Sequence, residues 1–148
     1  DERSRRVAEN TFELMDYLGR LEKQGRLDFW KHDPPPLQGR LAYHTPCHLH
    51  ALRTGGSTVD LLKKFGIQAV DLNGGCCGLA GTAGMQRKNH DMTEAIGRLL
   101  AGRIQEVEPD LILTECAACA MQIEHLVCKP AVHPVKLLWK YGFKETDK

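Results

Sequence analysis

Hydrophobic positions follow two different patterns along the chain, and the change near residue 40 divides it into two parts. Over residues 4–24, a spacing of three and four positions is typical of one face of an amphipathic helix. The stripe consists of Val7, Thr11, Leu14, Leu18 and Leu21. Such a face can pack on the chain's own domain, form a dimer seam or dock a neighbouring module. Gly25 is expected to end the helix and the proline-rich residues 32–39 cannot continue it, so residues 1–40 are predicted to be an N-terminal helix and a linker.

Beyond residue 40, short apolar runs alternate with amphipathic segments. The runs predicted as strands are residues 41–45, 68–72, 111–114 and 131–133. The predicted helices are residues 57–65, which start at Ser57 with Asp60 in a capping box, a long helix before Pro109, residues 120–127 and residues 135–141. The long helix is expected to form one apolar face from Met92, Ala95, Ile96, Leu99, Leu100, Ile104 and Val107. This alternation predicts an α/β fold of three layers over residues 41–148, with helices on both faces of a small parallel sheet.

The composition excludes several classes of protein. A net charge of +1 at pH 7 and the lack of a long basic run give no electrostatic case for nucleic acid. No apolar stretch reaches the roughly 18 residues of a membrane span, and the N-terminal "DERSRRVAEN" does not resemble a signal peptide. The chain contains 6 cysteines within an otherwise ordinary globular composition. Clustered cysteines in such a chain indicate a reducing compartment such as the cytoplasm, and metal or redox chemistry.

Most of the cysteines follow the predicted strands. The five that come at or just after a strand end are Cys47, Cys76, Cys77, Cys116 and Cys119. Because the carboxyl ends of parallel strands meet at one edge of a sheet, where open α/β folds bind their ligands, these five thiols are expected to converge. Cys128 ends a predicted helix away from that edge, and it is expected to be a buried structural thiol.

The adjacent pair Cys76 and Cys77 constrains what could bind. Neighbouring side chains of an extended chain point to opposite sides, so both thiolates reach one tetrahedral ion only through a strained turn, whereas a cluster offers each thiolate its own iron. Flanking glycines allow unusual backbone angles and let N–H groups approach the sulfurs. Cys116-Ala-Ala-Cys119 begins a helix, whose dipole favours thiolate. Zinc takes four ligands and would leave one thiol over, so an iron–sulfur cluster is favoured and zinc remains the alternative.

The order Cys47, Cys76-Cys77-Gly78, Cys116-Ala-Ala-Cys119 resembles the cysteine-rich CCG domain family. Members include the B subunit of heterodisulfide reductase, the iron–sulfur subunit of glycolate oxidase and the C subunit of anaerobic glycerol-3-phosphate dehydrogenase. The stretches that look most like the last of these are "YHTPCHLHAL", "GGCCGLAGTAG", "EAIGRLL" and "IEH…VHPVKLL". The resemblance covers residues 41–138.

This resemblance implies a cofactor, a role and partners. The ligands of an iron–sulfur centre of the 4Fe-4S type, which is non-cubane in heterodisulfide reductase, would be Cys47, Cys76, Cys77, Cys116 and Cys119. The domain would have no catalytic residues of its own and would relay electrons towards quinone within a membrane-associated flavin dehydrogenase. Implied partners are a flavoprotein dehydrogenase subunit, a second CCG repeat or ferredoxin-like module, and a membrane or quinone-reducing subunit. The implied location is cytoplasmic and, within the complex, peripheral on the inner membrane face.

Two features depart from the family pattern. Members usually carry two such domains, often behind a ferredoxin-like module, whereas this chain has one and no C-x2-C-x2-C-x3-C-P run, as an excised C-terminal piece would. The gap from Cys47 to Cys76 is a few residues shorter than in the heterodisulfide enzyme, which leaves the cluster type open. Two other functions stay open: a cluster that acts directly on a disulfide, and a structural zinc or thiol domain that docks partner subunits.

Histidines gather around the first of these cysteines. His44 and His48 could ligate the centre or donate to a sulfur, whereas His50 is expected at the surface. His133 ends the fourth predicted strand and could face the same edge. The run "GLAGTAG" lacks the G-x-G-x-x-G pattern, which argues against a dinucleotide loop. The face beside residues 74–84 is expected to dock the flavin subunit or the other repeat.

Overall fold

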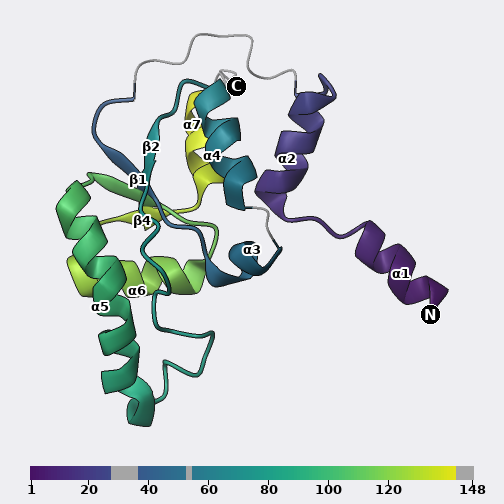
Figure 1. Cartoon of the computed structure of the whole chain (residues 1–148). Coiled ribbons are helices and arrows are strands. Elements are labelled where there is room, and N and C mark those ends of the chain that lie inside the picture. The colour runs from purple at the N-terminus through teal and green to yellow at the C-terminus, as the bar shows by residue number, and fades with distance from the viewer. Residues whose placement is uncertain (28–36, 53–54, 143–148) are drawn as a thin grey trace, which may run out of the picture.

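The computed structural model describes residues 1–27, 37–52 and 55–142. Within these ranges, a parallel sheet has the strand order β2-β1-β3-β4 (Figure 1). The strands are β1 (Leu41–Tyr43), β2 (Ala69–Asp71), β3 (Leu111–Leu113) and β4 (Ala131–Val132). All three neighbouring pairs run parallel, with Ala42 opposite Val70 on one side and Ile112 on the other. The predicted α/β class is confirmed, and each strand lies inside its predicted range but is shorter.

Helices cover both faces of this sheet (Figure 1). One apolar cluster joins the sheet to α5 (His90–Val107) and α6 (Ala117–Val127), and we call this the α5/α6 side. The other joins it to α2 (Leu14–Lys23), α4 (Gly55–Lys64) and α7 (Pro134–Gly142), the α2/α4/α7 side. Helix α3 (Cys47–Leu52) follows β1, and a 3-10 turn, η2 (Arg87–Asn89), precedes α5. None of the helices in the described ranges has the length and apolar character needed to cross a membrane.

Alternation along the strands assigns side chains to the two sides. Tyr43 belongs to the α2/α4/α7 cluster, whereas Ala42 belongs to the α5/α6 cluster. Leu113 and Ile112 divide in the same way on β3. Successive side chains of a strand point to opposite faces, so the residue that follows each strand is also assigned to one side.

The predicted single helix over residues 4–24 is wrong, because two helices occupy that range. Helix α1 (Glu2–Glu9) buries no residue, and Val7 is 67% exposed. The helix stops where two side chains bond to its last carbonyls: Asn10 Nδ2 donates to the Arg6 oxygen at 2.7 Å, and Thr11 Oγ1 donates to the Val7 oxygen at 2.7 Å. Such bonds compete with continued helical pairing. In α2 it is Met15 that is fully buried, while Leu14 is exposed.

Helix α5 buries only part of the predicted face, since Leu100 and Ile104 are buried as expected but other members are exposed. Its buried residues are Thr93, Gly97, Leu100, Ala101 and Ile104, whereas Met92 and Leu99 are 59% and 75% exposed. The close approach of the helix to its neighbours explains the difference. A Cβ atom at Gly97 would lie 2.6 Å from Leu126 Cδ1 and 2.8 Å from the carbonyl oxygen of Cys77. Helix α4 begins at Gly55 and not at Ser57, so the predicted capping box is not its start.

Candidate metal centre

Three neighbouring strands bring the cysteine-bearing segments to one edge of the sheet. Cys47 is the first residue of α3, just after β1, and the pair Cys76 and Cys77 lies in the loop after β2. Cys116 is the N-cap of α6, after β3, and Cys119 lies in the first turn of that helix. Because β1 stands between β2 and β3, the three segments leave the sheet side by side.

Contacts between side chains join these five thiols into one chain. Cys76 contributes to the pKa shifts of both Cys47 and Cys77, so it lies next to each of them. Cys77 and Cys119 shift each other's pKa, and Cys116 contributes to the shift of Cys119. All five are free of disulfides. Within residues 1–27, 37–52 and 55–142, no three His, Cys, Asp or Glu side chains form a group that could hold one metal ion. The thiols are thus linked pairwise along a path and are not gathered around a single point.

Cys128 lies apart from this path. It caps the carboxyl end of α6 with a left-handed backbone (φ 52°), so about 18 Å of helix separates it from Cys116. The expectation of a buried thiol is wrong, because Cys128 is exposed. The turn that ends α6 directs its side chain to solvent and not into the core.

The pKa values of the neighbouring thiols Cys77 and Cys119 shift in opposite directions. A hydrogen bond from the Cys119 thiol lowers the pKa of Cys77 to about 6, and the same bond raises the pKa of Cys119. Both side chains are buried within the α5/α6 cluster. The neighbouring Cys119 thiol therefore favours the thiolate form of Cys77, which is the form that binds soft metals and attacks disulfides. The Cys47 residue is exposed, and partial desolvation of its thiol together with the neighbouring Cys76 raises its pKa.

Backbone N–H groups also point at the sulfurs. The Gly78 N–H donates to Cys76 Sγ at 3.3 Å, and the Cys119 N–H donates to Cys116 Sγ at 3.5 Å. Gly78 has φ +97°, and a Cβ atom there would clash with the carbonyl oxygen of Thr93. Glycine is therefore required at this position, both for the backbone angle and for the packing of the cysteine loop on α5.

The four candidate histidines have different surroundings. His44 is 1% exposed, its Nε2 has no hydrogen-bond partner, and burial lowers its pKa to about 4. His48 and His50 are exposed, and His48 Nε2 lies 3.6 Å from Glu13 Oε1. His133 is half-buried, and its Nδ1 accepts a hydrogen bond from the Val135 N–H at 3.1 Å. His44 is thus the histidine enclosed by the fold at the carboxyl edge.

A buried polar network on the α2/α4/α7 side was not expected from the sequence. The Tyr43 hydroxyl donates to the Glu115 carboxylate at 2.9 and 3.0 Å, and Thr58 Oγ1 donates to the same carboxylate at 2.6 Å. Burial raises the pKa of Glu115 and that of Tyr43. Glu115 directly precedes Cys116, so the network anchors the turn that carries this thiol. No local spacing indicates it, although a charged residue at the end of a buried strand was a usable signal.

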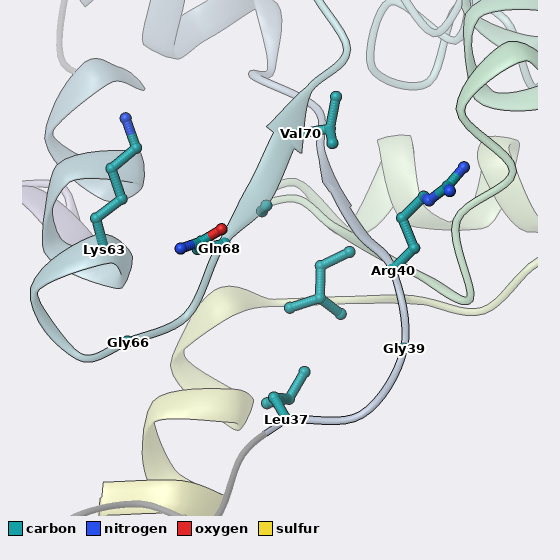
Figure 2. Close-up of a pocket in the computed structure, with 9 residues that line it drawn as sticks. Leu37, Gly39, Arg40, Lys63, Gly66, Gln68 and Val70 are labelled. Carbon is teal, nitrogen blue, oxygen red and sulfur yellow. The ribbon is translucent and has the colours of Figure 1, made fainter.

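A hollow lined in part by basic side chains lies at the opposite edge of the sheet. Figure 2 shows Leu37, Gly39 and Arg40 before β1, facing Gly66 and Gln68 before β2. The Arg40 guanidinium is tied down, since its Nη1 donates to the Val107 carbonyl at 2.6 Å. This hollow borders the amino ends of the strands and is separate from the thiols.

The chain is similar in sequence to several known proteins. The family model described as a cysteine-rich domain (CCG) matches residues 41–124. The C subunit of the anaerobic glycerol-3-phosphate dehydrogenase of Escherichia coli K12 is 38% identical over 104 residues, which cover 70% of this chain and 26% of that protein. An uncharacterised iron–sulfur protein of Methanocaldococcus jannaschii is 29% identical over 117 residues, 78% of this chain and 22% of that protein.

The B subunit of a fumarate reductase (CoM/CoB) from Methanothermobacter marburgensis is 29% identical over 109 residues, 70% of this chain and 22% of that protein. The chain spans about a quarter of the length of these curated relatives. The resemblance inferred from the cysteine spacing is therefore confirmed by the family match over residues 41–124, which include β1, β2, β3 and the five thiols. This chain belongs to the cysteine-rich CCG domain family.

Proposed function

We propose that this chain is an iron–sulfur electron-transfer domain of a flavin dehydrogenase complex similar to anaerobic glycerol-3-phosphate dehydrogenase. The single observation that carries the proposal is the placement of five cysteines after three neighbouring parallel strands, at the carboxyl edge of the sheet. The names of two relatives support it, since one belongs to a glycerol-3-phosphate dehydrogenase and the other to an iron–sulfur protein.

The proposed ligands are Cys47, Cys76, Cys77, Cys116 and Cys119. The donor set suits the group, because thiolates are the usual ligands of iron–sulfur clusters and backbone N–H groups already point at two of these sulfurs. A path of thiols favours a group with several iron atoms, such as a 4Fe-4S centre of cubane or non-cubane type, over one ion. When bound, such a cluster supplies one-electron chemistry, while the protein supplies position and hydrogen bonds.

Partner subunits are part of this proposal. The outward face of α5 carries exposed apolar side chains at Met92, Ile96 and Leu99, and α5 packs directly against the cysteine loop. We propose this face, next to residues 74–84, as the docking surface for a flavoprotein subunit or a second CCG repeat. Docking there would bring a redox partner close to the thiols, and a quinone-reducing subunit at the cytoplasmic membrane face would receive the electrons.

The test is purification of the full-length protein without oxygen, followed by iron and acid-labile sulfide analysis and a visible absorption spectrum. Stoichiometric iron and sulfide with a reducible visible band are expected. One bound zinc ion and no sulfide would replace the proposal with a structural zinc domain that docks subunits. Reduction of a heterodisulfide by the loaded protein with an artificial electron donor would indicate a cluster that acts on substrate.

A further inference from the structure

Three buried polar atoms in the described part of the chain have no hydrogen-bond partner. They are His44 Nε2, Thr114 Oγ1 and Gln122 Nε2. Their residues are 1%, 1% and 6% exposed. A buried donor without a partner is costly, and folded proteins keep few of them. If the three atoms lie close together, one common binding partner could account for all of them.

Two of them stand side by side at the carboxyl edge. The strands pair with Tyr43 opposite Leu113, so the next residues, His44 and Thr114, are neighbours in register. The pairing continues past the strand ends, because the His44 N–H donates to the Leu113 carbonyl at 2.9 Å and the Thr114 N–H donates to the Val132 carbonyl at 3.0 Å.

The alternation of side chains along a strand shows on which side of the sheet His44 and Thr114 lie. His44 and Thr114 each come two residues after a member of the α5/α6 cluster, Ala42 and Ile112 respectively. Both side chains are thus directed to the side on which Cys77 and Cys119 are buried.

The third atom approaches the same region from α6. Gln122 comes three residues after Cys119 and is buried with it on the inner face of that helix. A Cβ atom placed on Gly97 would lie 3.4 Å from Gln122 Nε2 and 2.8 Å from the carbonyl oxygen of Cys77, so both border one small space. All three unpartnered atoms therefore lie on the α5/α6 side, where the thiols of Cys77 and Cys119 are buried.

We propose that His44, Thr114 and Gln122 form a set of outer hydrogen-bond donors to the sulfur atoms of the group held by the five cysteines. This inference rests on the proposed cluster and adds residues that are not ligands. An imidazole N–H, a hydroxyl and an amide N–H are all suitable donors to thiolate or sulfide sulfur. Hydrogen bonds to the sulfurs are one of the factors that set a cluster's reduction potential, because they stabilise the more negative, reduced state.

Two near-isosteric variants test the set: Thr114→Val and Gln122→Met. In full-length protein purified without oxygen, both are expected to keep wild-type iron and sulfide content and to shift the midpoint potential to more negative values in a redox titration. Thr114→Ser, which keeps the hydroxyl, should restore the wild-type potential. Unchanged potentials in both variants, with the cluster present, overturn the inference while leaving the proposed function intact.

A second measurement uses the metal-free protein. Because the Thr114 hydroxyl has no protein partner, Thr114→Val should leave the melting temperature of the metal-free form unchanged or raise it. The control is Thr93→Val: Thr93 is 3% exposed, and its Oγ1 donates to the Gly84 carbonyl at 3.4 Å. It should lower that melting temperature without moving the potential. A fall for Thr114→Val as large as for Thr93→Val would mean that the hydroxyl is satisfied by the fold, and would overturn the inference.

The two proposals fail differently. Wild-type protein that binds no iron or sulfide refutes the cluster and the donor set together. Wild-type protein with a normal cluster and insensitive potentials refutes the donor set alone.

Discussion

Polar side chains that follow the strand ends are hydrogen-bonded on one side of the sheet and lack partners on the other. On the α2/α4/α7 side, the Tyr43 hydroxyl and Thr58 both bond to Glu115, so the network is satisfied by the fold. The next residue after Tyr43 is His44, which faces the α5/α6 side and whose Nε2 has no hydrogen-bond partner. That side buries the thiols of Cys77 and Cys119 and has no counterpart of the Glu115 carboxylate among the residues of its cluster. The comparison shows that the polar groups around Glu115 find partners within the fold, while His44 and Thr114 lack partners where we propose that the cluster binds.

Among the substitutions that test this difference between the two sides, Cys77→Ser is expected to have the largest effect. It removes the buried thiol that lies next to both Cys76 and Cys119, so iron and sulfide content should fall sharply and electron flow to quinone should stop. The flavin subunit should still oxidise its substrate with an artificial dye. Cys128→Ser is the matched control, since that exposed thiol lies at the far end of α6, and it should change neither measurement. Equal iron content in both variants would contradict the assignment.

On the satisfied side, Glu115→Ala should lower the free energy of unfolding by about 3 kcal/mol, because the Tyr43 and Thr58 hydroxyls lose their common acceptor. Urea denaturation of the metal-free protein measures this. Glu106→Ala removes an exposed ion pair with Arg103 and should cost less than about 0.5 kcal/mol. A loss no larger than that of the control would show that the network contributes little to the fold.

On the unsatisfied side, His44 should make the metal-free protein sensitive to acid. Its folded pKa of about 4 lies below the ordinary value of 6.5, so the unfolded chain takes up a proton that the folded chain does not. Stability is therefore full above pH 6.5 and falls as the pH drops towards 4, by roughly 3 kcal/mol at most.

The measurement is urea denaturation at several pH values in this window. His44→Phe should flatten the dependence, whereas His90→Gln, which changes an exposed histidine paired with Glu94, should leave it nearly as in the wild type. A profile for His44→Phe as steep as that of the wild type would mean that another group causes the acid sensitivity.

The smallest effect on stability is expected at the proposed docking surface. Leu99 is 75% exposed, so Leu99→Lys should change the free energy of unfolding by less than about 0.5 kcal/mol while weakening association with the flavoprotein subunit in a pull-down or by calorimetry. Val7→Lys, at a residue 67% exposed on α1, is the control and should affect neither quantity. Undiminished association of Leu99→Lys would move the docking surface elsewhere.

The succession of strands along the chain and the placement of five cysteines could be predicted because each depends on local sequence. Short apolar runs in the sequence predicted β1, β2 and β3, and each cysteine segment comes after one of these runs. Parallel pairing then sends every strand end to one edge, so the meeting of the Cys47, Cys76 and Cys116 segments needed no knowledge of packing.

Other features depended on contacts between distant segments. The buried face of α5 excludes Met92 and Leu99, because Gly97 allows the helix to approach Leu126 and the Cys77 carbonyl. The spacing of apolar residues in α5 gives no indication of this contact. The break between α1 and α2 came from side-chain bonds of Asn10 and Thr11, which the apolar stripe conceals.

The sequence by itself determined the α/β class, the family and which thiols lie at the carboxyl edge, since strand propensity and cysteine position are properties of short segments. Only the tertiary structure decided that Tyr43 and Glu115, 72 residues apart, share hydrogen bonds, and that the buried atoms of His44, Thr114 and Gln122 have no partner. The physical reason is that hydrogen-bond satisfaction depends on which groups the folded chain brings within about 3 Å of one another, and that distance is set by packing across the sheet.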